Sequence, residues 1–469
     1  MAQASNLSQV YEALSPEPLT TKEQFDAYYR DLNPVRGMDV VALMALNLWR
    51  ASAASPYKAF LMGHSGVGKS TELTRLIQRV NERYRAVRFS AVSELDPTSF
   101  RPFDVLLLMM ARVVEEATRT VEEGGPGLSI ASERLDEIWR WLSGEKITRS
   151  VTTGVGAAAE AGAGLKGGSL LANVLGLFAS IKGEMKYASE RKTEIVEYRL
   201  SRLSQLIDLA NRLLDDCNGA LRRAAGQEWL VIGEDFDKPG IPKGRVEDLF
   251  LTYANVFKEL RSHLIITIPI TLGQSTQAVR LPFPANQRIC LPDTPVYDAG
   301  HGPHAVGRAA LRSVLEARVA PDLFEAGQME RLLVASGGNL RDLFALAARA
   351  ADNALLRAGG ADRPSLHVAP PDVSAAIDWM RGEYQRRLGD SPYDDERIDY
   401  KVKAERMVRL YNAEPAADIP DACLYSLLRA RVIQEFNGKR WLGVHPLAVD
   451  ILASQGLLGD TRPVPGGTE

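Results

Sequence analysis

Cysteine is scarce in this sequence, and the few cysteines lie far apart. Only Cys217, Cys290 and Cys423 occur among 469 residues, and no two of them form a Cys-x-x-Cys pair. An odd, scattered set argues against a disulfide framework and a zinc site, and it fits a reducing compartment. The amino terminus also lacks the basic region and apolar run of a signal peptide. The sequence therefore predicts a cytoplasmic protein.

Long apolar runs and a surplus of one charge are missing too. The clearest apolar run, 170–181, is far shorter than the roughly 20 residues that a membrane-spanning helix needs, so we expect no stable membrane span. The formal net charge is −3, from 56 Lys and Arg against 59 Asp and Glu. This balance provides no overall basic surface for nucleic acid or for an anionic membrane.

One glycine-rich stretch carries the strongest chemical signal in the chain. It reads Gly63-His64-Ser65-Gly66-Val67-Gly68-Lys69-Ser70, with Thr71 following, and it stands between an apolar strand candidate and a helix candidate. Glycines let backbone N–H groups converge on phosphate oxygens, and the following helix adds its own free N–H groups. In such a loop Lys69 would bridge the β- and γ-phosphates and the Ser70 hydroxyl would hold Mg²⁺, whereas we expect His64 to be an exposed loop position. The pattern predicts a phosphate-binding loop (P-loop); a chance glycine-rich turn is the competing interpretation.

Acidic residues follow a later strand candidate, 229–232. Glu234 and Asp235 come at its end, where a P-loop enzyme needs a carboxylate to hold Mg²⁺ and to align water. The spacing leaves open which of the two binds the metal and which polarises water. Asp237 and Lys238 read as a local ion pair or turn, and a solvated acidic turn is the alternative for the whole segment.

The chain divides by pattern into five regions. We expect an N-terminal helical segment at 1–56, a P-loop core at 57–300 with a helical and Gly/Ala-rich insertion at about 110–225, a helical lid at 301–390, a winged-helix domain at 391–459 and a disordered tail at 460–469. Core strands are expected at 57–62, 84–92, 229–232, 263–270 and 288–292. The fold class is therefore α/β, with a parallel five-stranded P-loop core.

With these pieces the sequence resembles the AAA+ ATPases, in the branch shared by origin-recognition-type initiators and the STAND signalling ATPases. Gly63–Ser70 matches Walker A, and 230–235 matches Walker B with Glu where Asp is common. The resemblance implies a sensor threonine near the γ-phosphate, Thr267 or Thr271, and makes Arg341 the candidate γ-phosphate contact of the lid. It also implies an arginine that reaches a neighbouring subunit, for which Arg280 and Arg288 are the candidates, so a homo-oligomer is compatible with it.

The Gly/Ala-rich tract at 151–183 has two interpretations. It could be a glycine-zipper segment that packs between subunits or against a membrane, since small residues permit close helix approach. We favour the simpler interpretation, a loop over the long helix predicted by the apolar spacing at 196–214.

The predicted winged helix could contact DNA or protein. Lys and Arg total eight between 398 and 460, and Asp and Glu also total eight, whereas DNA binding needs a basic surplus on one face. Arg429, Arg431, Lys439 and Arg440 could form a small basic patch, but we favour a protein partner over nucleic acid.

The resemblance thus implies an ATP- and Mg²⁺-dependent conformational switch that controls a protein partner or effector. Such ATPases recur in bacterial stress and phage-defence systems. A DNA-binding loader and a scaffold that scarcely hydrolyses ATP are the alternatives. No guanine-reading Asn-Lys-x-Asp motif is evident, and its absence favours ATP.

Overall fold

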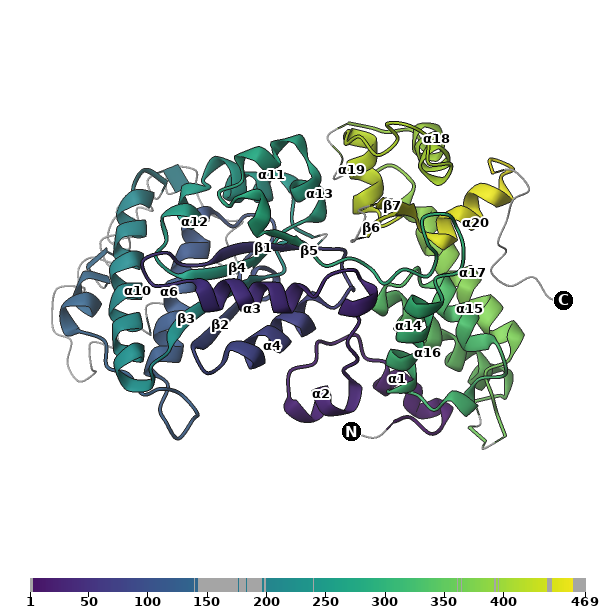
Figure 1. Cartoon of the computed structure of the whole chain (residues 1–469), viewed down its shortest axis with the longest axis horizontal. Coiled ribbons are helices and arrows are strands. Elements are labelled where there is room, and N and C mark those ends of the chain that lie inside the picture. Colours follow the sequence, from purple (N-terminus) through teal and green to yellow (C-terminus); the bar gives the residue numbers. More distant parts are fainter. Residues whose placement is uncertain are drawn as a thin grey trace, which may run out of the picture.

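The computed structural model describes residues 3–138, 140–141, 176, 183, 196–197, 200–238, 240–360, 362–363, 365–391, 394, 396–436 and 441–458. Three parts are evident in Figure 1: an α/β core on the left, a helical lid at the lower right and a small C-terminal module at the upper right. The Gly/Ala-rich tract at 151–183 falls almost wholly outside the described residues, as does the expected tail at 460–469.

The core is built on a parallel five-stranded sheet of order β2-β3-β4-β1-β5. This confirms the predicted fold class. The strands are β1 (Lys58–Met62), β2 (Tyr84–Ser90), β3 (Glu228–Glu234), β4 (His263–Thr267) and β5 (Arg288–Cys290). Because all five run in the same direction, their carboxyl ends meet at one edge of the sheet, where ligands bind in open α/β folds.

Helices cover both faces of the sheet, so both faces of each central strand are apolar. On β1, Ala59 and Leu61 pack beneath α3 (Val40–Arg50) and α4 (Lys69–Val80), while Phe60 and Met62 face the other layer. That second layer holds α6 (Pro102–Thr118), α10 (Leu203–Ala225), α11 (Lys243–Glu247) and α12 (Asn255–Glu259). The short helices α5 (Ala91–Glu94) and α13 (Ile270–Gln274) follow β2 and β4.

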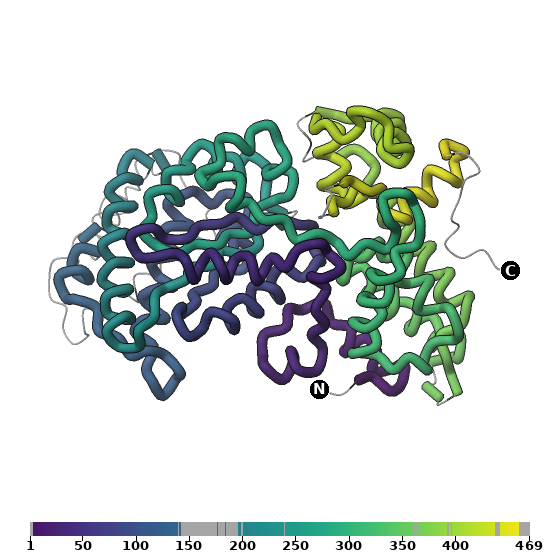
Figure 2. Tube along the Cα trace, in the orientation of Figure 1, coloured from purple at the N-terminus to yellow at the C-terminus, as the bar shows by residue number. Residues whose placement is uncertain are grey.

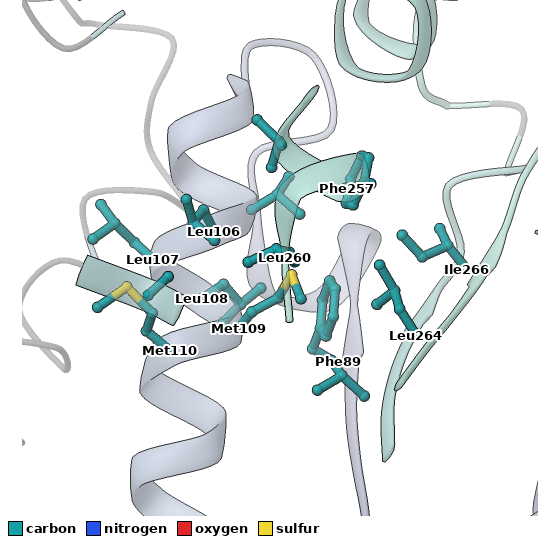
Figure 3. Close-up of a cluster of buried hydrophobic side chains, with 14 of the residues drawn as sticks. Phe89, Leu106, Leu107, Leu108, Met109, Met110, Phe257, Leu260, Leu264 and Ile266 are labelled. Carbon is teal, nitrogen blue, oxygen red and sulfur yellow. The ribbon is translucent and has the colours of Figure 1, made fainter. Parts of the chain in front are cut away.

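The described ends of the expected insertion belong to this covering layer. All five residues Leu106–Met110 of α6 are buried. Figure 3 shows Met109 on the side of the helix that faces Phe89 of β2, and Leu107 and Met110 on the opposite side. On α10 the predicted apolar seam is buried too, at Leu203, Ile207, Ala210 and Leu214. The seam thus packs within its own domain.

The lid consists of α14 (Ala305–Glu316), α15 (Gln328–Ala335), α16 (Leu340–Arg357) and α17 (Pro370–Arg387). The N-terminal segment joins it: α1 (Val10–Ala13) and α2 (Lys22–Tyr28) run past the junction of core and lid, as the purple tube of Figure 2 shows. Backbone hydrogen bonds anchor this segment to the lid, with Ala4 N donating to Arg318 O at 2.8 Å.

The C-terminal module contains α18 (Tyr400–Tyr411), α19 (Ala422–Arg429), an antiparallel pair β6 (Ile433–Phe436) and β7 (Trp441–Val444), and α20 (Pro446–Ser454). The connection between the two strands, 437–440, lies outside the described residues, and the winged-helix assignment stays a prediction. None of the helices in the described residues has the length and apolar character to cross a membrane.

The layer between α6 and the sheet should dominate the stability of the core. Leu108 is completely buried there, so Leu108→Ala removes apolar contacts and leaves a cavity, at a cost of about 2–5 kcal/mol. We expect thermal unfolding of this variant to begin well below that of the wild type. Leu356→Ala is the control because Leu356 is 71% exposed on α16. Equal shifts for both variants would contradict this packing.

Candidate nucleotide-binding site

The P-loop lies between β1 and α4, at the carboxyl edge of the sheet. Its three glycines have positive φ angles, 144° at Gly63, 95° at Gly66 and 100° at Gly68. A side chain at Gly66 would also collide with the lid, because a Cβ there would stand 2.4 Å from Asn339 Oδ1. Glycine is therefore required both by the backbone conformation and by the approach of the lid.

Lys69 is held inside the loop by three oxygen partners. Its Nζ donates to the carbonyl oxygens of Gly63 (2.7 Å) and His64 (2.9 Å) and pairs with Asp237 Oδ2 at 2.9 Å. Burial alone would raise the pKa of Asp237, but the charge and hydrogen bond of Lys69 outweigh it, so the pKa lies below its usual value. The sequence-based interpretation of Asp237 as a turn residue missed this pairing, for which the only signal was its position three residues after Glu234.

The two acids predicted from the Walker B pattern differ in their partners and in their position relative to the cavity. Glu234 ends β3 and accepts from Arg88 Nε of the neighbouring strand at 2.6 Å. Asp235 takes a left-handed conformation, with φ of 67°, and lines the same cavity as the P-loop. Ser90 Oγ donates to it at 2.6 Å. Asp235 thus lines the cavity, whereas Glu234 does not line it and is paired with Arg88.

Arg88 was not predicted, although it connects the acid to the P-loop helix. Besides Glu234, its guanidinium donates to Thr74 Oγ1 at 2.7 Å and to the carbonyl oxygen of Ser70 at 3.4 Å. In the sequence Arg88 looks like an ordinary residue of a strand. Its contact with Glu234 follows only from the pairing of β2 with β3.

Thr267 ends β4 and lines the same cavity. Its side chain is 2% exposed, and Oγ1 has no hydrogen-bond partner among the described residues. A buried hydroxyl without a partner is costly unless a ligand or water satisfies it. The alternative, Thr271, stands on α13 and does not line the cavity.

The lid reaches the P-loop through the start of α16. Arg341 Nη1 donates to Ser65 Oγ at 2.7 Å, and its backbone N donates to Gly66 O at 3.3 Å. Asn339 caps the helix and donates to Ser65 O at 3.1 Å. Arg341 also lines the cavity, so the structure brings it together with Lys69, Asp235 and Thr267.

His64 is buried, which corrects the expectation of an exposed loop residue. Its Nδ1 lies 3.0 Å from Asp293 Oδ2, and its side chain is 4% exposed. Asp293 also accepts from Asn339 Nδ2 and Gln434 Nε2, each at 2.9 Å. Burial opposes this charge, but the three partners together lower the pKa of Asp293 to about 2. His64 thus points away from the phosphate site and joins the loop to the lid and the C-terminal module.

The N-terminal segment forms the far wall of the cavity, which the sequence did not reveal. Leu19 N donates to Thr71 Oγ1 at 3.3 Å, and Arg36 Nη2 donates to Val67 O at 2.9 Å. Apolar side chains of this segment and of the lid complete the wall: Pro16, Leu19, Tyr28, Leu32, Leu340 and Phe344. The cavity has a volume of about 110 Å³, and the P-loop forms its polar side.

The two candidate intersubunit arginines lie apart from this cavity. Arg288 Nη1 donates to Ala278 O at 2.9 Å, and Arg280 Nη1 donates to Gln277 at 3.4 Å. Neither lines the cavity. A role of either arginine across subunits stays a prediction.

The divergent positions of the acids predict unequal effects on hydrolysis. Asp235→Asn should lower ATP turnover about 100-fold or more, the usual contribution of a positioned acid or base, while ATP affinity changes little. Glu234→Gln, the matched neutral variant, should reduce turnover less because Arg88 already occupies that carboxylate. Phosphate release and equilibrium titration distinguish the two effects. A larger loss of turnover for Glu234→Gln than for Asp235→Asn would reverse the assignment.

Comparisons with known proteins identify distant structural similarity alone. No known family matches the sequence, and no curated protein is similar to it. A Walker-type ATPase of Pyrococcus abyssi has a TM-score of 0.43 and 13% identity, over 94% of this chain and 99% of its own. The ORC2 protein of Aeropyrum pernix has a TM-score of 0.38 and 13% identity, over 96% and 98%. The parallel sheet and the glycine-rich loop between β1 and α4 themselves give the chain an α/β P-loop fold.

Proposed function

We propose that the chain binds ATP with Mg²⁺ and acts as a conformational switch whose C-terminal module responds to the nucleotide. The nucleotide part rests on the P-loop, with Lys69 and the start of α4 as the phosphate site. Ser70 and Asp235 are the proposed magnesium side, and Thr267 and Arg341 the proposed γ-phosphate contacts. Bound Mg²⁺ would neutralise charge that develops on the phosphates, and Asp235 would align the attacking water.

The observation that carries the switch is the position of Arg431. This residue lies between α19 and β6 of the C-terminal module, in a left-handed conformation with φ of 61°. Its Nη1 donates to Ser65 O of the P-loop at 2.9 Å, and its Nη2 pairs with Asp342 of the lid at 3.0 Å. One guanidinium thus joins the P-loop, the lid and the C-terminal module.

Further contacts hold the C-terminal module in this position. Gln434 Nε2 donates to Gly337 O at 3.0 Å, in addition to its bond to Asp293. The buried His445 lies 3.2 Å from Ser336 O and stacks on Tyr384, and burial lowers its pKa to about 4. A shift of the P-loop or lid on nucleotide binding would break or move these contacts together, which is how a local change at phosphate becomes a movement of the module.

The same contacts weigh against the DNA-binding alternative. Arg431 donates to the P-loop, and Arg429 lies 3.6 Å from Asp394, so these two arginines of the proposed basic patch have partners within the protein. Helix α19 of the module lies against the core, where Thr276 N donates to the Tyr425 hydroxyl at 3.3 Å. We therefore propose a protein partner for the module; a role in stress or phage defence is an expectation of the resemblance alone.

The P-loop assignment predicts the effect of Lys69→Ala. Loss of the ammonium removes charge-assisted hydrogen bonds to the phosphates, each contributing about 1.5–3 kcal/mol, so ATP affinity should fall about 100-fold or more. Titration calorimetry with ATP, and with GTP in parallel, measures this and the base preference. Lys401→Ala is the control because the Lys401 side chain is 87% exposed on α18. Unchanged ATP affinity in Lys69→Ala would refute the site.

The switch predicts that ATP alters the C-terminal module through Arg431. In hydrogen exchange, ATP should change the protection of β6, β7 and the start of α16 in the wild type. Arg431→Met keeps the apolar stem but removes the guanidinium, so protection of the module should fall without nucleotide and respond weakly to ATP. Arg429→Met, which removes an arginine that does not reach the P-loop, should keep the response. An ATP response as large in Arg431→Met as in the wild type would contradict the coupling.

A further inference from the structure

A second cavity, of about 400 Å³, lies in the C-terminal module and shares no lining residue with the nucleotide cavity. Its walls are the loop 296–301 that follows β5, the loop 411–418 that follows α18, the strands β6 and β7, and the start of α20. Nothing in the proposed nucleotide chemistry uses this space.

Aromatic rings form much of the wall. Trp441 of β7 stacks on Phe436 of β6, with ring centroids 4.3 Å apart and an angle of 22° between the planes. Tyr411 stacks on His301 with centroids 4.0 Å apart, and Tyr297 lines the cavity beside them. The faces of such rings carry negative charge density and attract cations.

The charged residues of the wall are all acidic. Asp298, Glu414, Asp418 and Asp450 line the cavity, and no Lys or Arg does so among the described residues. Three arginines stand close behind the wall, and one of them, Arg406, donates to Ala417 O at 3.0 Å. Arg409 pairs with Glu414 at 3.2 Å, and Arg308 lies over the Tyr297 ring at 4.8 Å while donating to Val296 O. The balance of the lining is still negative, and Asp450 contributes, after burial, to the raised pKa of Tyr297.

We propose that this cavity binds the guanidinium of an arginine in a basic segment of a partner protein. A planar guanidinium can stack on an aromatic face and pair with a carboxylate at the same time. A metal ion would be bound by the carboxylates and would gain little from the rings. The rim favours a peptide over a free polyamine. Ile419 beside Asp418 is 60% exposed and offers an apolar contact for flanking residues.

The cavity is connected to the P-loop by two residues. Gln434 lines the cavity and donates to Asp293, and Asp293 pairs with His64 of the P-loop. A guanidinium in the cavity would therefore be connected to the nucleotide site through the hydrogen bonds of Gln434, Asp293 and His64. This link, unlike the binding site itself, rests on the proposed switch function.

Fluorescence anisotropy with the full chain tests the binding site directly. The probe is a labelled, end-capped hexapeptide with one central arginine, and its partner peptide has citrulline, which keeps the shape but not the charge. We expect the arginine peptide to bind at least about fivefold more tightly, with affinity that falls as salt rises. Equal affinity of the two peptides would overturn the proposal. Spermidine and excess unlabelled arginine peptide are then compared as competitors of the labelled peptide. Equal competition by the two, together with an affinity that does not depend on the residues flanking the arginine, would overturn the choice of a peptide.

Substitutions locate the binding. Trp441→Ala should lower the affinity for the arginine peptide about five- to tenfold. Trp441→Phe should retain most of the affinity because it keeps an aromatic face. Asp418→Asn, at an exposed position that should not affect folding, should weaken it two- to fivefold. Trp379→Ala is the control because Trp379 stands on α17 outside the cavity. Unchanged affinity in both Trp441→Ala and Asp418→Asn would overturn the site.

The same assay separates this proposal from the switch. Lys69→Ala should bind the peptide normally, since the cavity does not need nucleotide. In the wild type, ATP should change peptide affinity, and Gln434→Leu should abolish that change. Peptide binding that ATP leaves unaffected would overturn the link through Gln434 and leave the arginine site standing.

Discussion

The carboxylate of Asp293 is buried where the P-loop, the lid and the C-terminal module meet, and it needs a partner from each of them. A buried charge is tolerated only when hydrogen bonds replace its lost water. His64, Asn339 and Gln434 supply those bonds, one from each part. Removing any of the three would leave the charge less satisfied, so this carboxylate favours the arrangement in which all three parts are docked.

Opposite charges are paired in the same way around the phosphate site. Lys69 is held by Asp237 and two carbonyl oxygens, and Arg88 holds Glu234 against the P-loop helix. The charges that would meet phosphate and metal are thus already oriented by the protein. Such preorganisation reduces the reorganisation that binding and chemistry would otherwise require.

The structure contains two cavities with opposite electrostatic character. The nucleotide cavity presents the P-loop, Lys69 and Arg341, which suit an anion. The cavity of the C-terminal module presents aromatic faces and carboxylates, which suit a cation. Gln434 and Asp293 join them, so the fold contains a short physical route along which the occupancy of one could influence the other.

The local features of this protein were determined by its sequence alone. The P-loop at Gly63–Ser70, the five strands of the sheet and the helical nature of the lid follow from residue order and period, because neighbouring residues decide them. Arg341 and Thr267 were also placed at the site, although only through the family resemblance.

The contacts that connect the parts were decided by the tertiary structure. Asp237 at Lys69, Arg88 at Glu234 and Arg431 at Ser65 join residues far apart in the chain, the last pair separated by 366 positions. No local pattern specifies such partners, because each depends on which strands pair and on how the modules dock. His64 shows the same limit: its loop position suggested exposure, and only the docking of the lid and C-terminal module buries it against Asp293.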